Sequence, residues 1–264
     1  MDLNYYLARK DEKPLDRIVD DGGFCSVFRT IGVIGDSLSS GEFESMSEEG
    51  VKAYHDYFEY SWGQYIARAA GINVFNFSRG GMTAKRFYES YTREVVFWYP
   101  EKMCQAYIIA LGVNDMNHGT PLGSTADIDP ENFNKNADTL AGWLGRIIAR
   151  IKTLQPQARF FLVSRPKDGT TEGNLKSESH AKLMNELAEY FDYTYVIDLC
   201  KYGPVYDAEF KKNFYLGGHM NPAGYILTAK MIMSYIDFII RNDLESFSQV
   251  GFIGKGLKNA KAKL

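Results

Sequence analysis

The stretch IGVIGDSLSSGE at residues 31–42 places a serine directly after an apolar run. The run ends in Gly35-Asp36-Ser37-Leu38, and further small residues follow it. A short, continuous apolar run is typical of a strand covered on both faces, whereas Gly, Asp and Ser favour a tight turn. We therefore expect Ser37 at the carboxyl end of a buried strand, the end at which parallel α/β sheets bind ligands.

Runs rich in β-branched and aromatic residues predict strands at residues 27–34, 72–77, 106–111, 159–163 and 193–198. Helices are expected between them, at residues 48–70, 132–154, 177–191 and 222–241. This alternation predicts an α/β fold, with a parallel sheet between two helical layers and right-handed crossovers. No repeat or Pro/Gly/Ser linker divides the chain, so we predict one domain at 26–245, an N-terminal arm at 1–25 and a C-terminal tail at 246–264.

The bulk composition argues against several classes of function. The formal net charge of −3 gives no basic surplus for nucleic acid. No apolar run approaches the about 18 residues of a membrane span. The first residues lack a basic region followed by an apolar stretch, so we expect a cytoplasmic protein unless a leader has been removed. Three separated cysteines without C-x-x-C spacing predict free core thiols.

Chemistry-bearing residues follow the other predicted strands as well. The second strand leads into NFSRGGMT (76–83), the third into LGVND (111–115), and a late loop reads GGHMNPAGY (217–225). If these segments meet at one rim, His219 can accept the proton of Ser37. The N–H groups of Ser37 and Gly81 and the amide of Asn114 can then stabilise an oxyanion. We expect no metal or other cofactor, because no second ligand at metal spacing accompanies a histidine.

These four blocks, in this order, resemble the Ser, Gly, Asn and His blocks of the SGNH hydrolases, also called GDSL esterases and lipases. The resemblance implies a flavodoxin-like αβα sandwich whose five parallel strands lie in the order 2-1-3-4-5. It also implies ester hydrolysis through an acyl-serine. Ser37 would be the nucleophile and an oxyanion donor, Gly81 and Asn114 further oxyanion donors, and His219 the base.

One position departs from the family's pattern. The family usually has an aspartate three residues before its histidine, and Leu216 stands there instead. We favour the backbone carbonyl of Leu216 as the group that orients His219. The alternative is Asp198, at the end of the fifth predicted strand, although a capping role suits it better. Asp36 and Asp115 are predicted to brace loops.

The sequence thus predicts a serine esterase that acts on a small-molecule ester, with an acetylated sugar as one candidate substrate. A lysophospholipase or thioesterase is an alternative. So is an SGNH-fold protein that binds a ligand and has lost turnover, as the missing aspartate suggests. An FMN- or NAD-binding protein is disfavoured, because no Gly-x-Gly-x-x-Gly follows a strand. The oligomeric state is not indicated.

Overall fold

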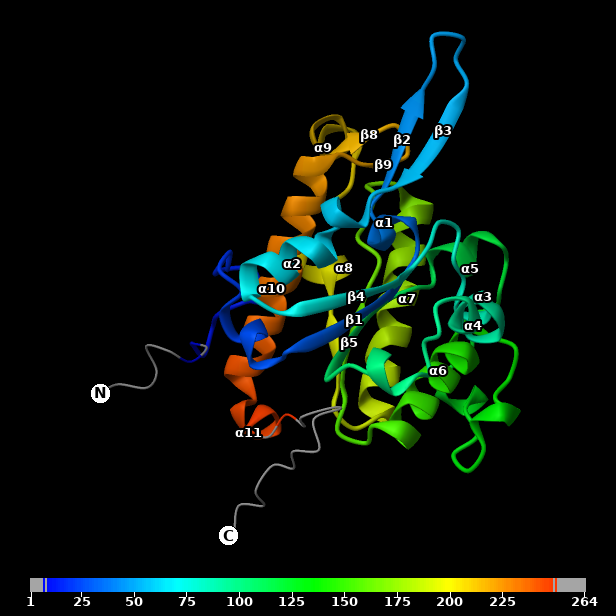
Figure 1. The fold of residues 1–264 in the computed structure, drawn as a ribbon, viewed down its shortest axis with the longest axis vertical. Coiled ribbons are helices and arrows are strands. Elements are labelled where there is room, and N and C mark those ends of the chain that lie inside the picture. The colour runs from blue at the N-terminus through cyan, green and yellow to red at the C-terminus, as the bar shows by residue number, and fades with distance from the viewer. Residues whose placement is uncertain (1–6, 8, 249, 251–264) are drawn as a thin grey trace.

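The computed structural model describes residue 7, residues 9–248 and residue 250. Its centre is a five-stranded parallel sheet in the order β4-β1-β5-β6-β7 (Figure 1). The strands are β1 (Thr30–Gly35), β4 (Asn73–Ser78), β5 (Ala106–Ala110), β6 (Arg159–Val163) and β7 (Thr194–Ile197). Along the chain these are the five predicted strands, so the predicted α/β class and the order 2-1-3-4-5 are both confirmed.

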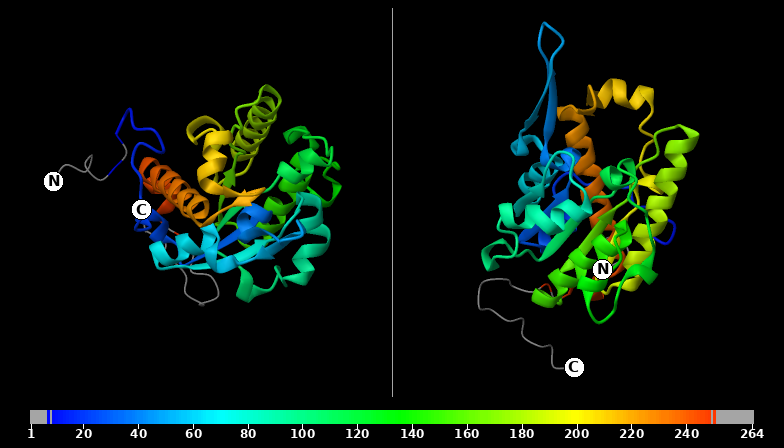
Figure 2. Two further views of the ribbon diagram at one scale, coloured as in Figure 1. Left: turned by 90° about the horizontal axis from the view of Figure 1, so that it is seen from above. Right: turned by 90° about the vertical axis from the view of Figure 1, so that its right-hand side faces the viewer.

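Helices cover both faces of the sheet, as Figure 2 shows from two directions. The helices are α1 (Ser37–Ser40), α2 (Trp62–Ala70), α3 (Ala84–Arg86), α4 (Thr92–Glu94), α5 (Val113–Asn117), α6 (Leu140–Leu154), α7 (Thr171–Tyr190), α8 (Leu199–Tyr202), α9 (Ala208–Phe214), α10 (Pro222–Asn242) and α11 (Leu244–Phe247). Shorter turns of helix lie at η2 (Gly23–Val27), η3 (Phe58–Tyr60), η4 (Phe87–Tyr91), η5 (Pro100–Lys102), η6 (Thr125–Asp127) and η7 (Phe133–Lys135).

Strand β1 shows why the sheet needs two covering layers. Ile31 and Val33 pack into a core cluster with α2 and α10, whereas Ile34 packs into a second cluster with α6 and α7. Successive side chains of a strand point to opposite faces, so an unbroken apolar run buries both faces of the sheet.

The predicted N-terminal arm, as far as the structure describes it, packs on α10. The Val19 N–H donates to Ser234 Oγ at 2.8 Å, and the Phe24 N–H donates to Asp237 Oδ1 at 2.9 Å. Helix α10 is the one helix in the described part of the chain with the length and apolar character of a membrane span. Most of it is buried inside the fold, so it serves as a core helix.

The predicted C-terminal tail lies mostly outside the described residues. Its expected start at residue 246 falls inside α11, a short helix that buries Phe247 against the core. Residues 246 and 247 therefore belong to the folded part of the chain.

Helix α7 begins at Thr171, earlier than the predicted residue 177, and two further helix predictions are wrong in part. Residues 48–56 belong to an antiparallel hairpin of β2 (Glu42–Met46) and β3 (Lys52–Asp56), and only α2 remains of the helix expected at 48–70. The turn contains Gly50 with a φ of 80°, and Ser61 caps α2. Similarly, α6 begins at Leu140 behind the Thr139 cap instead of at residue 132. In both cases a capping hydroxyl sets the helix start.

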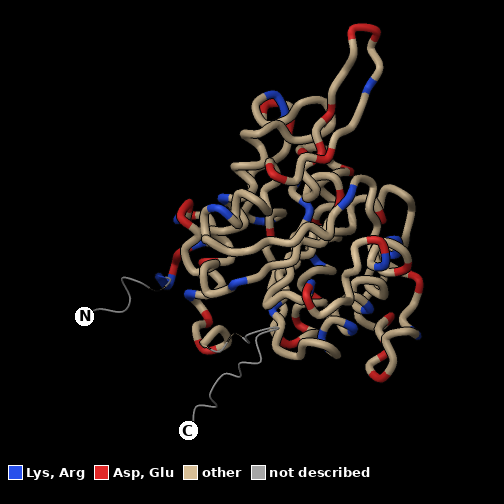
Figure 3. Tube along the Cα trace, viewed as in Figure 1, with Lys and Arg blue, Asp and Glu red and all other residues tan. Residues whose placement is uncertain are grey.

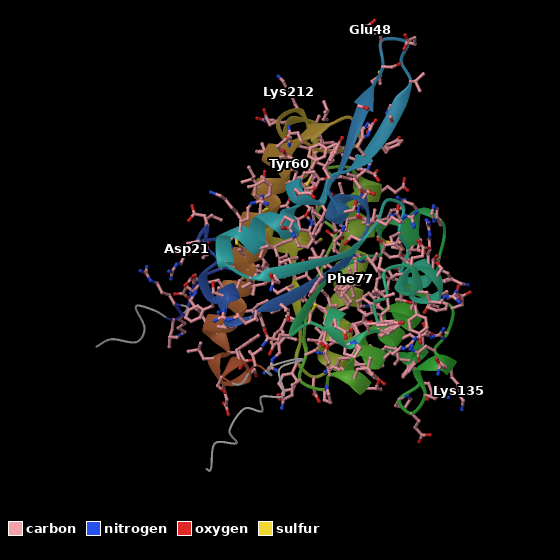
Figure 4. All side chains as sticks on the ribbon, in the orientation of Figure 1. Asp21, Glu48, Tyr60, Phe77, Lys135 and Lys212 are labelled. Carbon is pink, nitrogen blue, oxygen red and sulfur yellow. The ribbon has the colours of Figure 1, made fainter. Side chains whose placement is uncertain are left out.

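The β2–β3 hairpin projects from the body of the fold beyond the carboxyl ends of the sheet strands (Figure 1). Glu48 is at its tip in Figure 4, and Figure 3 shows acidic residues gathered there. Both strands follow α1 directly in the chain, so the hairpin stands beside the predicted site.

Candidate active site

Ser37 is the first residue of α1, and only Asp36 separates it from the end of β1 at Gly35. Asp36 caps α1 by accepting the Leu38 N–H at 3.1 Å, which makes Ser37 the first helical residue. Gly35 is required there, because a Cβ on it would come within 2.3 Å of Ser39 Oγ. Ser37 is therefore not the cap of its own helix. Its hydroxyl makes no hydrogen bond to any residue that the structure describes.

The glycine and asparagine blocks meet the serine block at this edge. Strand β1 lies between β4 and β5, so the segments that follow these three strands are neighbours. The Asn114 amide donates to the Met82 carbonyl at 3.1 Å and lies 3.4 Å from Asp36 Oδ2. It thereby ties the three segments together. Gly81 is exposed, with a φ of 66°.

Two buried aspartates stiffen this arrangement. Asp115 accepts the Ala84 N–H with both oxygens, at 3.0 and 3.2 Å, and so joins the asparagine block to the glycine block. Burial raises the pKa of Asp115 to about 6. Burial also raises the pKa of Asp36 to about 6, with a contribution from the charge of Asp115. Both residues make the loop-bracing contacts that the sequence predicts for them.

His219 lies in a small hairpin just before α10. Strands β8 (Tyr215–Leu216) and β9 (His219–Met220) pair with Leu216 opposite His219. The turn between them contains Gly217 with a φ of 67°. Asn221 caps α10 by accepting the Gly224 N–H, and Pro222 occupies the first turn. This predicted cap fixes the backbone next to the histidine.

The imidazole of His219 contacts two glutamates of β2. Its Nε2 lies 2.9 Å from Glu42 Oε1, and its Nδ1 lies 3.5 Å from Glu44 Oε2. Nδ1 makes no hydrogen bond in this structure, although the Glu44 carboxylate lies within ion-pairing distance of a protonated ring. The Tyr54 ring packs edge-on against the imidazole, with ring centroids 5.6 Å apart.

Neither predicted orienting group contacts this ring. The Leu216 carbonyl makes no hydrogen bond to Nδ1, so it does not set the imidazole in this structure. Asp198 caps α8 by accepting the Lys201 N–H at 3.1 Å, and it accepts a hydrogen bond from Ser164 at 2.9 Å. The capping role preferred for Asp198 is the one observed.

Glu42 and Glu44 are not among the site residues predicted from the sequence, because no element is expected for residues 42–47. A detectable signal was present in EFESM (42–46), where the carboxylates are two residues apart, followed by the turn residues SEEG and a second alternating run. Alternation with period two predicts a strand that carries both carboxylates on one face. Among the residues that the structure describes, no group of three or more His, Cys, Asp or Glu has a metal-site arrangement.

A family model for the GDSL-like Lipase/Acylhydrolase family matches residues 33–227, most of the chain. The chain belongs to this family. The match spans all four blocks and both strands of the β2–β3 hairpin. A search of curated proteins found no match.

Three solved structures are similar to this GDSL-family protein. A Lactobacillus plantarum protein is 18% identical over 80% of this chain and 97% of its own, with a TM-score of 0.56. A family two carbohydrate esterase from Clostridium thermocellum, solved with cellohexaose, is 17% identical over 83% of this chain and 65% of its own, with a TM-score of 0.56. The esterase EstA from Pseudoalteromonas sp. is 16% identical over 81% of this chain and 100% of its own, with a TM-score of 0.52. At these identities the likeness shows the fold alone.

The GDSL-family protein also has a cavity of about 80 Å³ behind α1. Residues next to the site line it: Asp36 and Leu38 flank Ser37, Val113 precedes Asn114, and Met220 follows His219. Most of the remaining lining is apolar and comes from the ends of β5 and β6 and from α8 and α10. The cavity is therefore a small, mostly apolar space beside the Ser, Asn and His blocks.

Proposed function

We propose that this acylhydrolase is a serine esterase that cleaves short acyl esters through an acyl-serine. The observation that carries the proposal is the joining of the Ser, Gly and Asn blocks through the Asn114 amide. His219 lies beside them, because β9 packs against α1. Glu42 bridges His219 to the glycine block, since a Cβ on Gly80 would come within 2.2 Å of Glu42 Oε2.

The proposed reaction has two acyl transfers. Ser37 Oγ attacks the ester carbonyl carbon while its proton passes to His219, and the Ser37 and Gly81 N–H groups and the Asn114 amide hold the oxyanion. The C–O bond to the leaving group breaks, and the leaving alkoxide takes the proton from His219. Water then attacks the acyl-serine and gives a proton to His219. Release of the carboxylic acid returns that proton to Ser37.

One step requires a rearrangement of the contacts described above. His219 Nε2 faces Glu42, and Ser37 makes no hydrogen bond to the ring. For His219 to accept the serine proton, Nε2 must exchange Glu42 for the Ser37 hydroxyl. The same observation favours the second candidate, a ligand-binding protein without turnover, and the experiment below separates the two.

The cavity supports a short acyl group. A volume of about 80 Å³ accommodates a few heavy atoms and not a long chain. This argues against long-chain lysophospholipids as substrates. The acetyl group of a carbohydrate ester is small enough for this cavity. The fold similarity to a family two carbohydrate esterase is the reason to test acetylated sugars first.

The test combines covalent labelling with turnover. A fluorophosphonate probe should label Ser37, and p-nitrophenyl acetate should be hydrolysed faster than the palmitate ester. Ser37→Ala should abolish both the labelling and the ester hydrolysis. His219→Ala should lower the rates of labelling and hydrolysis by at least about 10³-fold. Ser47→Ala, a change of an exposed hairpin serine, should alter neither. Absence of labelling in a folded wild-type protein would favour the ligand-binding protein.

A further inference from the structure

The inner face of the β2–β3 hairpin closes over the His219 ring. Glu42 and Glu44 are two residues apart on β2, so their side chains leave the same face of the strand. Tyr54 of β3 is directly opposite Glu44 in the register and shares that face. The other face is anchored in the fold, because Phe43 packs on Tyr225 with ring centroids 5.3 Å apart. The register of β2 therefore fixes which carboxylates reach the imidazole.

Glu44 is tightly held where it meets the ring. Its Oε1 lies 2.5 Å from Lys52 Nζ, its Oε2 accepts the Gly218 N–H, and its side chain is only 6% exposed. A Cβ at Gly217 would come within 2.6 Å of the carboxylate, so the glycine turn before His219 makes room for it. The Lys52 and Gly218 contacts lower the pKa of Glu44 to about 2. Glu44 thus stays charged over the working pH range of a histidine base.

Glu42 is held less firmly. Within the described residues, its carboxylate has His219 Nε2 as its one polar partner. Burial raises the pKa of Glu42, His219 opposes this effect, and the nearby charges of Asp56 and Glu44 add to the rise. Glu42 is therefore the carboxylate that the Ser37 hydroxyl can displace from Nε2, whereas Glu44 remains beside Nδ1.

We propose that Glu44 orients His219 and takes the place of the aspartate that the family usually has three residues before its histidine. The inference rests on the proposed function, since orientation of the ring matters only if His219 moves protons. Glu44 Oε2 lies 3.5 Å from Nδ1, so it can accept the Nδ1–H when the ring turns from Glu42 to Ser37. A carboxylate that accepts this N–H selects the tautomer that leaves Nε2 free to accept a proton, and it stabilises the imidazolium that forms. Glu44 is a positioning residue, supplied by the hairpin after the serine.

The central test is Glu44→Gln, with Glu48→Gln at the exposed hairpin tip as the matched control. Glu44→Gln should lower kcat by about 10³- to 10⁴-fold with little change in KM, as loss of the orienting acid does in other serine hydrolases. Fluorophosphonate labelling of Ser37 should slow to the same extent. Glu48→Gln should match the wild type in both measurements.

The pH profile separates orientation from a merely structural role. Among the described residues, the charged groups around the ring are Glu42 and Glu44 from β2 and two residues of β3, Asp56 beside Glu42 and Lys52 beside Glu44. Removal of the negative charge at residue 44 disfavours the imidazolium, so the acid limb of kcat/KM should move to lower pH, by roughly one unit. If Glu44→Gln does not fold, Lys52→Met, which removes the ion pair that holds the Glu44 carboxylate, should lower kcat.

The outcomes are distinct. A folded Glu44→Gln protein with kcat within ten-fold of the wild type would overturn the role of Glu44 and leave the esterase proposal standing. So would a loss of activity with an unmoved acid limb. If the wild type itself is not labelled at Ser37, the proposed function fails, and the role of Glu44 fails with it.

Discussion

At the scale of single residues, the Asp36 side chain determines whether the Ser37 hydroxyl is available for catalysis. Asp36 takes the capping position of α1 and accepts the Leu38 N–H. At the first helical position, the Ser37 hydroxyl therefore has no hydrogen-bond partner among the residues that the structure describes. A capping serine would instead give its oxygen to a backbone N–H. The Asp36 side chain therefore stabilises the turn, and the Ser37 hydroxyl stays available for catalysis.

The same region contains buried carboxyls that make stability depend on pH. Burial raises the pKa of Asp115 to about 6, from an ordinary value of 3.8. The folded protein therefore binds this proton more tightly than the unfolded chain does. The stabilising contribution is complete below about pH 4 and is lost as the pH rises through about 6, and it amounts to roughly 3 kcal/mol. The free energy of unfolding should fall over this range.

Asp115→Asn should flatten that slope, because an amide does not titrate and its oxygen still accepts the Ala84 N–H. The measurement is urea unfolding of both proteins at several values between pH 4 and pH 7. Asp129→Asn is the control, and it should leave the slope between pH 4 and pH 7 unchanged. Backbone N–H groups of Asn132 and Glu131 lower the Asp129 pKa, so its contribution is lost as the pH falls. Parallel profiles for the wild type and Asp115→Asn would contradict the prediction.

At the scale of elements, the hairpin shows how a sequence prediction fails. Residues 48–61 are rich in aromatic residues, which suit a buried helix and a strand equally well by composition. The alternating pattern on either side of SEEG favours two strands, but the run is short and half of it is exposed. Helix α10 was predictable because its Asn-Pro start carries a local signal.

The packing of the N-terminal arm on α10 gives a prediction about stability. Arg241 is buried between Asp237, with Nε 2.7 Å from Oδ2, and Glu12, with Nη2 2.7 Å from Oε1. Arg241→Met should lower the free energy of unfolding by about 3–5 kcal/mol, because it leaves two carboxylates without their cation. The measurement is the urea midpoint together with its slope.

Lys230→Met is the matched control for this prediction, since it breaks an exposed ion pair with Asp20 between the same helix and the same arm. It should cost less than about 1 kcal/mol. Equal losses in the two variants would show that burial of the Arg241 pair is not what stabilises the contact.

At the scale of the whole molecule, the cavity depends on several elements at once. The cavity is enclosed by strand ends and by α1, α8 and α10. Val113 forms the part of the cavity wall next to Asn114. Val113→Ala should widen it and raise kcat/KM for p-nitrophenyl butyrate relative to acetate, by about three- to ten-fold. Val51→Ala, at the exposed hairpin, should leave the ratio unchanged. A ratio unchanged in Val113→Ala would place the acyl group elsewhere.

The sequence by itself determined the five strands, their order through the family resemblance, and the loops that bring Ser37, Gly81, Asn114 and His219 to one edge of the sheet. These features follow from local apolar runs and from motifs that each strand carries at its own end. The tertiary structure alone decided which groups contact the His219 ring. Glu42 and Glu44 are about 175 residues away along the chain, and only the register of the hairpin and its packing on Tyr225 bring them there.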